Sequence, residues 1–112
     1  MSIAVTSTKN ALADRYAALG AWISVHTGAP GTTGANEASG GGYARKQTTW
    51  GTASGGTVTG TEVTIDAPAG SFTAAGLWTA ATGGTFIDTV AVVSTQLGAP
   101  GQLKITPTYT QT

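Results

Sequence analysis

Short runs rich in Thr, Val, Ile and aromatic residues, separated by turns that contain glycine, fill the chain from Ala21 onward. β-Branched and aromatic side chains fit a pleated, half-buried surface, and glycine supplies the backbone angles of tight turns. The runs cover residues 22–26, 43–50, 57–66, 71–79, 85–88, 90–94 and 103–109. They predict a mainly β protein, a small β-sandwich or partly open barrel of six to seven short strands.

One α-helix is expected before these strands, over residues 7–19. Leu12, Tyr16 and Leu19 stand at i, i+4 and i+7, on one stripe of such a helix. Serine and threonine side chains at its start can cap it, and Gly20 suits the C′ position that ends it. Because so narrow a stripe does not stabilise an isolated helix of about three turns, the helix should pack on the β region.

The length of the chain limits the number of domains, and its charge balance limits the kinds of partner that it can bind. A chain of 112 residues fits a single domain over 1–112, with a β part over 21–112. Its five basic and five acidic residues give zero net charge, and only Arg45 and Lys46 form an adjacent basic pair. Since phosphate binding needs clustered Lys and Arg, we expect no nucleic-acid partner. No apolar run approaches the ~20 residues of a membrane span, so no membrane partner is expected either.

Gly, Thr and Ala occupy 58 of the 112 positions, whereas charged residues make up 9%. A free small domain usually keeps about 25–35% charged residues on its surface. The exposed surface here must consist largely of Thr, Ser, Gly and Ala, which cost little to desolvate. Such a surface suits burial against another protein, although a weakly soluble β protein would have the same composition.

Groups that could carry catalysis are few and scattered. His26 has no Gly-x-Ser-x-Gly motif to accompany it, and the chain has no cysteine. Glu37 and Glu62 are a conceivable carboxylate pair for glycoside hydrolysis, with no other feature in support. No two potential metal ligands stand four apart on the expected helix. We therefore expect no enzyme activity, no cofactor and no metal.

A long glycine-rich loop over residues 27–42 follows the first strand. Loops of this length in compact domains are usually functional, packed on themselves or disordered. Tyr43 and the Arg45–Lys46 pair follow it, and this group fits either an interface anchor or a charged guard on a strand edge. We expect the helix and the loop to contact another protein. The expected interface residues are Tyr16, Thr32, Thr33, Asn36, Glu37, Tyr43, Arg45 and Lys46.

The three tryptophans, Trp22, Trp50 and Trp78, fall on three different expected strands. Large aromatic side chains at such positions usually form or cap a core. A platform on which sugar rings stack is the alternative, and it would make the chain a carbohydrate-binding module.

The stretch His-Thr-Gly-Ala-Pro-Gly-Thr-Thr-Gly-Ala-Asn-Glu over 26–37, with residues 40–45 and Trp50, resembles a recurring segment of small virion proteins. These are structural proteins of tailed bacteriophages, notably of actinobacterial hosts. The likeness extends to residues 10–14 of the expected helix and to the hairpin over 76–86. Relatives often carry an acidic residue where this chain has Ala29, so any contact made through that acid is absent here.

The resemblance implies a β-sandwich component of the virion, assembled in the bacterial host cytoplasm. From resemblance and composition together, we expect foremost a capsid decoration protein that stabilises the shell by bridging major capsid subunits. A homo-oligomer, for instance a trimer, would suit such a site. The alternative is a minor tail or tail-fibre component that binds other tail proteins.

Overall fold

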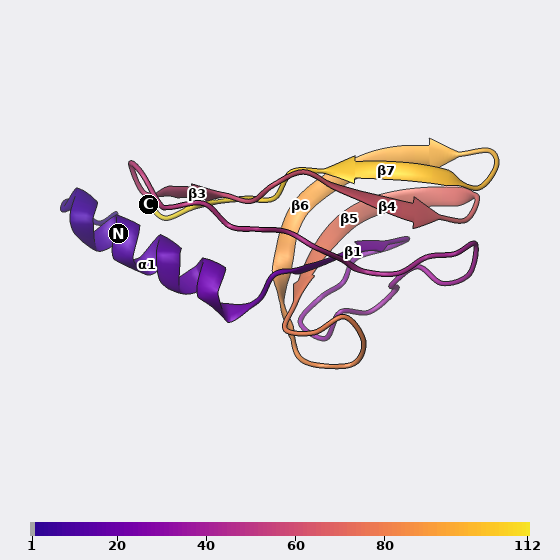
Figure 1. Ribbon diagram of the computed structural model, residues 1–112, viewed down its shortest axis with the longest axis horizontal. Helices are drawn as coiled ribbons and strands as arrows, with labels where there is room; N and C mark the ends of the chain where they lie inside the picture. Colours follow the sequence, from indigo (N-terminus) through magenta and orange to yellow (C-terminus); the bar gives the residue numbers. More distant parts are fainter. Residues whose placement is uncertain (1) are drawn as a thin grey trace.

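The computed structural model describes residues 2–112, except for the side chain of Val92. Figure 1 shows one helix at one end of an elongated molecule of 47 × 24 × 23 Å, and strands in the remainder. The elements in chain order are α1 (Thr6–Leu19), β1 (Trp22–His26), β2 (Lys46–Gln47), β3 (Thr57–Thr59), β4 (Val63–Ala67), β5 (Gly70–Trp78), β6 (Phe86–Leu97), β7 (Gly101–Ile105) and β8 (Thr108–Thr110). The predicted mainly β architecture with one N-terminal helix is confirmed.

The strands form three open antiparallel sheets rather than a closed barrel. The largest has the order β2-β1-β5-β6, and two ribbons pair β4 with β7 and β3 with β8. Ile23, Phe72 and Leu77 from the large sheet and Ile65 from the β4–β7 ribbon are fully buried in one shared core. The β3–β8 ribbon lies beside α1, at the end where both chain termini are marked (Figure 1).

Strand β1 is buried on both faces. The alternation of its sequence places Ile23 and Val25 on the face toward the core, but Ser24 and His26 on the opposite face are also without exposed surface. Their polar atoms bond to Trp78 and to the backbone of Ala35, which cover this face. The alternating sequence of β1 is typical of a half-buried strand, but the strand lies in the interior.

The predicted hairpin over 76–86 is confirmed as the β5–β6 pair, with its turn between Trp78 and Phe86. The expected strands over 85–88 and 90–94 are one continuous strand, β6. Its register against β5 shifts at three places, and each time β6 contains one residue more than β5. Extra residues of this kind are β-bulges, which bend and twist a strand. The strong curvature of β6 is visible in Figure 1.

Two expected strands are each divided in two, which brings the strand count to eight. The run over 57–66 breaks at Gly60 and the run over 103–109 breaks at Pro107, where the Gly60 amide donates to the Pro107 carbonyl at 2.8 Å. Proline cannot continue a ladder because it has no N–H. The region 43–50 is also less regular than expected, since only Lys46 and Gln47 form a strand.

The helix begins at Thr6, one residue before the predicted start, and no side chain caps it. Its packed face agrees only in part with the expected stripe: Tyr16 packs on Tyr109, but Leu12 and Leu19 are 44% and 40% exposed while Ala13 is fully buried. Small residues on this face allow the helix to lie close to the β3–β8 ribbon. Side chains of α1 also bind the turn before β3: Asn10 Oδ1 accepts from the Gly56 amide at 2.8 Å and Asp14 Oδ1 from the Ala53 amide at 2.9 Å.

Gly20 joins the helix to β1 in an extended conformation and is not the left-handed C′ residue that was expected. Its glycine identity has another cause. A Cβ atom at position 20 would lie 2.5 Å from the carbonyl oxygen of Trp78, and the Gly20 carbonyl itself accepts a hydrogen bond from Trp50 Nε1 at 2.8 Å. The helix and the sheet therefore meet at a point where a side chain does not fit.

We predict that Gly20→Ala lowers the free energy of unfolding by about 1–3 kcal/mol, the usual cost of overpacking. Urea denaturation followed by tryptophan fluorescence measures the change. Gly98→Ala is the matched control, because a Cβ atom there would meet nothing within 4 Å. Equal denaturation midpoints for the two variants would show that the close approach at Gly20 is unimportant.

Candidate functional site

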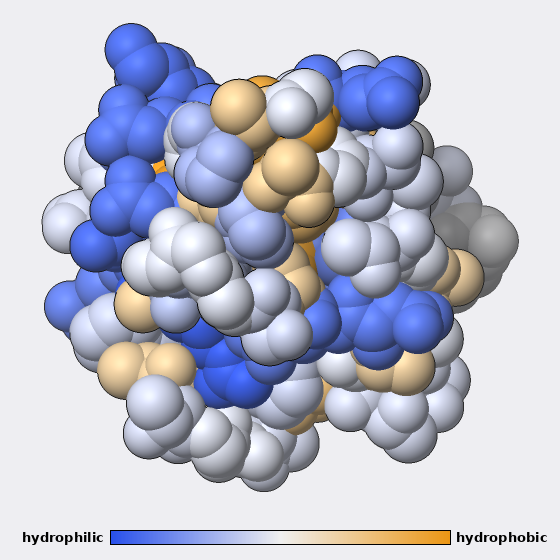
Figure 2. Space-filling model, turned by 90° about the vertical axis from the view of Figure 1, so that its right-hand side faces the viewer, coloured by the Kyte–Doolittle hydropathy of each residue, from blue (hydrophilic) through white to orange (hydrophobic). Residues whose placement is uncertain are grey.

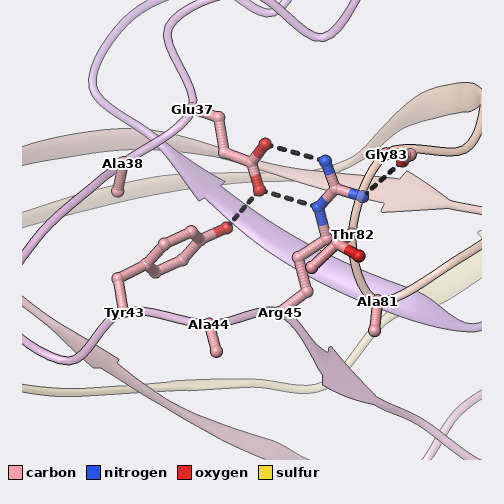
Figure 3. A pocket seen from close by; sticks show the side chains of 8 residues that line it. All are labelled: Glu37, Ala38, Tyr43, Ala44, Arg45, Ala81, Thr82 and Gly83. Atoms are coloured by element: carbon pink, nitrogen blue, oxygen red, sulfur yellow. Dashed lines mark hydrogen bonds and ion pairs between the residues drawn. The ribbon is translucent and has the colours of Figure 1, made fainter.

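A pocket of about 310 Å³ opens between the segment after the glycine-rich loop and the turn of the β5–β6 hairpin (Figure 3). Its walls combine small apolar side chains with a few polar ones. The lining residues are Glu37, Ala38, Tyr43, Ala44, Arg45, Ala81, Thr82 and Gly83.

The Arg45 side chain dominates this pocket and is only 8% exposed. Its Nε donates to Glu37 Oε2 at 2.8 Å and its Nη2 to Glu37 Oε1 at 2.9 Å, which makes a bidentate ion pair. Its Nη1 donates to the carbonyl oxygens of Ala80 at 3.0 Å and Gly83 at 2.8 Å. One guanidinium group thus ties the glycine-rich loop to the hairpin turn. We call Arg45, Glu37 and Tyr43 the arginine clamp.

The Arg45 guanidinium of the clamp lies against the face of the Trp78 ring. The Arg45 Cζ atom lies 3.6 Å from the ring centroid, a cation–π contact. Phe86 meets the same ring edge-on, with centroids 5.2 Å apart. The backbone of Gly34 also presses on this ring: a Cβ atom there would clash with it, and the φ angle of +77° favours glycine.

The Glu37 carboxylate is held in its charged form. Burial works to raise the pKa of Glu37, but the hydrogen bonds from Arg45 and Tyr43 outweigh it and hold that pKa below its usual value. The Tyr43 hydroxyl donates to Glu37 Oε2 at 2.6 Å. Burial, followed by this bond to a carboxylate, raises the pKa of the Tyr43 phenol. Glu37 is therefore charged and Tyr43 protonated around neutral pH.

Of the expected interface residues, Glu37, Tyr43 and Arg45 come together, but with their polar groups turned toward one another. Thr32 and Thr33 are exposed on the glycine-rich loop, and Lys46 is exposed on β2. Asn36, on the same loop, donates from Nδ2 to the Ala29 carbonyl, and Tyr16, on α1, stacks on Tyr109 with centroids 3.8 Å apart. Their role at an interface stays a prediction.

Sequence reasoning missed the partners that complete the clamp. The carbonyls of Ala80 and Gly83 are backbone groups of a turn, so residue types do not indicate them. Trp78 was predicted as a core residue or a sugar platform, and it is buried, with Arg45 stacked on its ring. Trp50 contacts Tyr16 edge-on and donates to Gly20, so two of the three candidate platforms are engaged inside the molecule.

The charged and polar groups of the clamp are engaged within the molecule, by one another and by backbone carbonyls. The clamp charges neutralise each other, and Glu62, the other half of the conceivable carboxylate pair, does not line the pocket. Within residues 2–112, no three His, Cys, Asp or Glu side chains gather where they could hold a metal ion. Over the same residues, no helix has the length and apolar character needed to span a membrane.

Comparison with known proteins identifies one family whose model matches most of the chain. Residues 6–108 match the family described as podophage GP4 fiber I protein gp80. The chain belongs to this family. It is therefore a structural protein of a phage, and the matched range contains the helix, the clamp and the β5–β6 hairpin. No curated protein and no solved structure matches the chain.

We predict that Arg45→Ala destabilises this fibre-family protein by about 3 kcal/mol, because it leaves the partly buried Glu37 carboxylate without its cation. Urea denaturation measures the loss. The double variant Arg45→Ala/Glu37→Ala should lose less than the sum of the single variants, since the two groups act as one pair. Lys46→Ala, an exposed neighbour on β2, should change stability by no more than about 0.5 kcal/mol. If the loss of stability in the double variant equals the sum of the losses in the two single variants, Arg45 and Glu37 do not stabilise the fold as a pair.

A second prediction concerns acid stability. The pKa of Glu37 is lower in the fold than its unfolded value of 4.5, so the unfolded chain takes up the proton first. The stabilisation is present above pH 4.5 and is lost as the pH falls through the lower pKa of the folded state. Glu37→Gln should be less stable at pH 7 and should show a flatter decline between pH 4.5 and pH 3. The exposed Glu62→Gln is the matched control, and a Glu37→Gln curve that follows it refutes the prediction.

Proposed function

We propose that this chain is a component of a tail fibre in the virion of a tailed phage that infects an actinobacterium. Membership of a fibre protein family carries the proposal and favours the tail over the capsid shell that the sequence suggested foremost. The proposed partners are other tail proteins of the same virion and further copies of this chain.

The shape and internal bracing of the molecule agree with such a role. The molecule is about twice as long as it is wide. Side-chain contacts to the backbone brace two separate turns: Asn10 and Asp14 hold the turn before β3, at the end where α1 lies, and Arg45 holds the hairpin turn. A component of a fibre must keep the parts on either side of it in a fixed relative position. Turns and loops that are held against the sheets give it this rigidity.

The surface also suits permanent contact with other proteins. In Figure 2, which views the end of the molecule opposite α1, pale residues of intermediate hydropathy lie between blue, hydrophilic groups at the left, the upper right and the centre, and strongly orange atoms occupy only a narrow central strip. Exposed loop residues such as Thr32 and Thr33 contribute no charge. A neutral surface of small side chains costs little to desolvate, because few ions must lose their water. The partner surface should therefore also be largely uncharged.

The copy number of the chain in purified virions tests the proposal. Quantitative mass spectrometry against the major capsid protein should find a small fraction of the capsid copy number, and antibody labelling in electron microscopy should mark the tail. A stoichiometry comparable with the capsid subunit, with label over the head, would overturn the fibre proposal in favour of shell decoration. Absence from virions would overturn both.

A further inference from the structure

The bonds of the arginine clamp leave one N–H of the Arg45 guanidinium group free. A guanidinium has five N–H donors in one plane. Nε and Nη2 each donate once to Glu37, and Nη1 donates to the carbonyls of Ala80 and Gly83. The second N–H of Nη2 has no acceptor among residues 2–112. A ligand at this group can therefore accept at most one hydrogen bond from it.

One flat face of the same guanidinium group is open to the pocket. The Trp78 ring covers the other face, with Arg45 Cζ 3.6 Å from the ring centroid. Arg45 lines the pocket, whereas Trp78 does not, so the guanidinium separates the pocket from the ring. In Figure 3 the group lies between Glu37 and the hairpin turn at Gly83. Because the Arg45 side chain is only 8% exposed, a molecule reaches its outer face only by entering the pocket.

The charges around the pocket favour an uncharged occupant. Glu37 and Arg45 are both charged and neutralise each other. An anion would meet the Glu37 carboxylate and find a single free N–H, whereas a cation would meet Arg45. Either ion would also lose its water without gaining a full set of partners. The remaining walls are mainly apolar, with three alanines and the Tyr43 ring.

The open guanidinium face favours an aromatic ring as that occupant. The plane of a guanidinium stacks on aromatic rings through cation–π attraction, as it already does here on Trp78. A second ring on the outer face would place the cation between two rings. The volume of about 310 Å³ is at the lower end of the ~300–1,000 Å³ usual for ligand pockets. This space suits one large side chain, and single aromatic side chains in pockets often anchor protein interfaces.

We propose that this pocket binds an aromatic side chain of another tail protein, which stacks on the outer face of Arg45. Every tryptophan, tyrosine and phenylalanine within residues 2–112 is buried or half-buried, so a second copy of this chain has none freely exposed to insert. The location of the partner in the tail rests on the proposed function. The choice of an aromatic side chain rests on the pocket alone.

NMR titration of the full chain with capped amino acids tests the pocket. N-acetyltryptophanamide should cause saturable shifts of the Arg45 Nε–H signal and of the Ala44, Ala81 and Thr82 amide signals. N-acetylleucinamide should bind roughly two- to fivefold more weakly, because it lacks a π face for the cation. Acetate and glucose should leave these signals in place. The proposal is overturned if the tryptophan probe causes no saturable shift, if the leucine probe binds equally well, or if acetate or glucose binds at these residues.

A variant that fills the pocket locates the binding. Ala81 is exposed at the rim and makes none of the clamp bonds through its side chain, so Ala81→Leu should fold and should abolish the shifts caused by the tryptophan probe. Ala99→Leu is the matched control, because Ala99 is equally exposed but lies outside the pocket. Undiminished binding to Ala81→Leu would refute the proposal. Since the titration uses the isolated chain, such a failure leaves the fibre proposal to be decided by the copy number in virions.

Discussion

Packing around the Trp78 side chain holds the separate parts of this molecule together. Its ring carries the Arg45 guanidinium and lies against Gly34, while its indole nitrogen donates to Ser24 inside the sheet. Its carbonyl oxygen occupies the space where a side chain at position 20 would lie. The glycine-rich loop, the hairpin turn and the junction with the helix therefore all depend on one residue. A large aromatic side chain can fill this role because it offers wide apolar faces and one polar atom.

The features that were predictable from sequence are those that local chemistry determines. Alternation and glycine turns indicated the hairpin at Trp78 and Phe86. The packed face of the helix was only partly right, because Tyr16 of the expected stripe packs inward but Ala13 does so in place of Leu12, a choice that depends on the shape of the ribbon it meets. The burial of Ser24 and His26 was missed for a similar reason, since Trp78, distant from β1 in sequence, and the backbone of the folded-back loop at Ala35 cover them.

The candidate site was likewise predictable from the sequence only in part. Tyr43 and the Arg45–Lys46 pair were recognised as a group and Glu37 as a further interface residue, and the structure brings Glu37, Tyr43 and Arg45 together. Their expected direction was outward, whereas their polar atoms satisfy one another and the backbone of the hairpin turn. Spacing in the sequence says little about orientation when a loop with several left-handed glycines lies nearby. The same limit applies to the place in the virion, because a neutral surface of small residues fits a shell and a fibre equally, and the family match favours the fibre.

The three extra residues in β6 have a consequence for assembly. This strand stands at the edge of the large sheet and is twelve residues long, and Asp88 is its only charged side chain. Long edge strands with so little charge normally risk pairing with strands of neighbouring molecules. A strand whose outer row of N–H and C=O groups is interrupted by bulges cannot offer a long, regular template for such pairing. Copies that are crowded together during virion assembly would then associate through specific interfaces rather than through pairing of their edge strands.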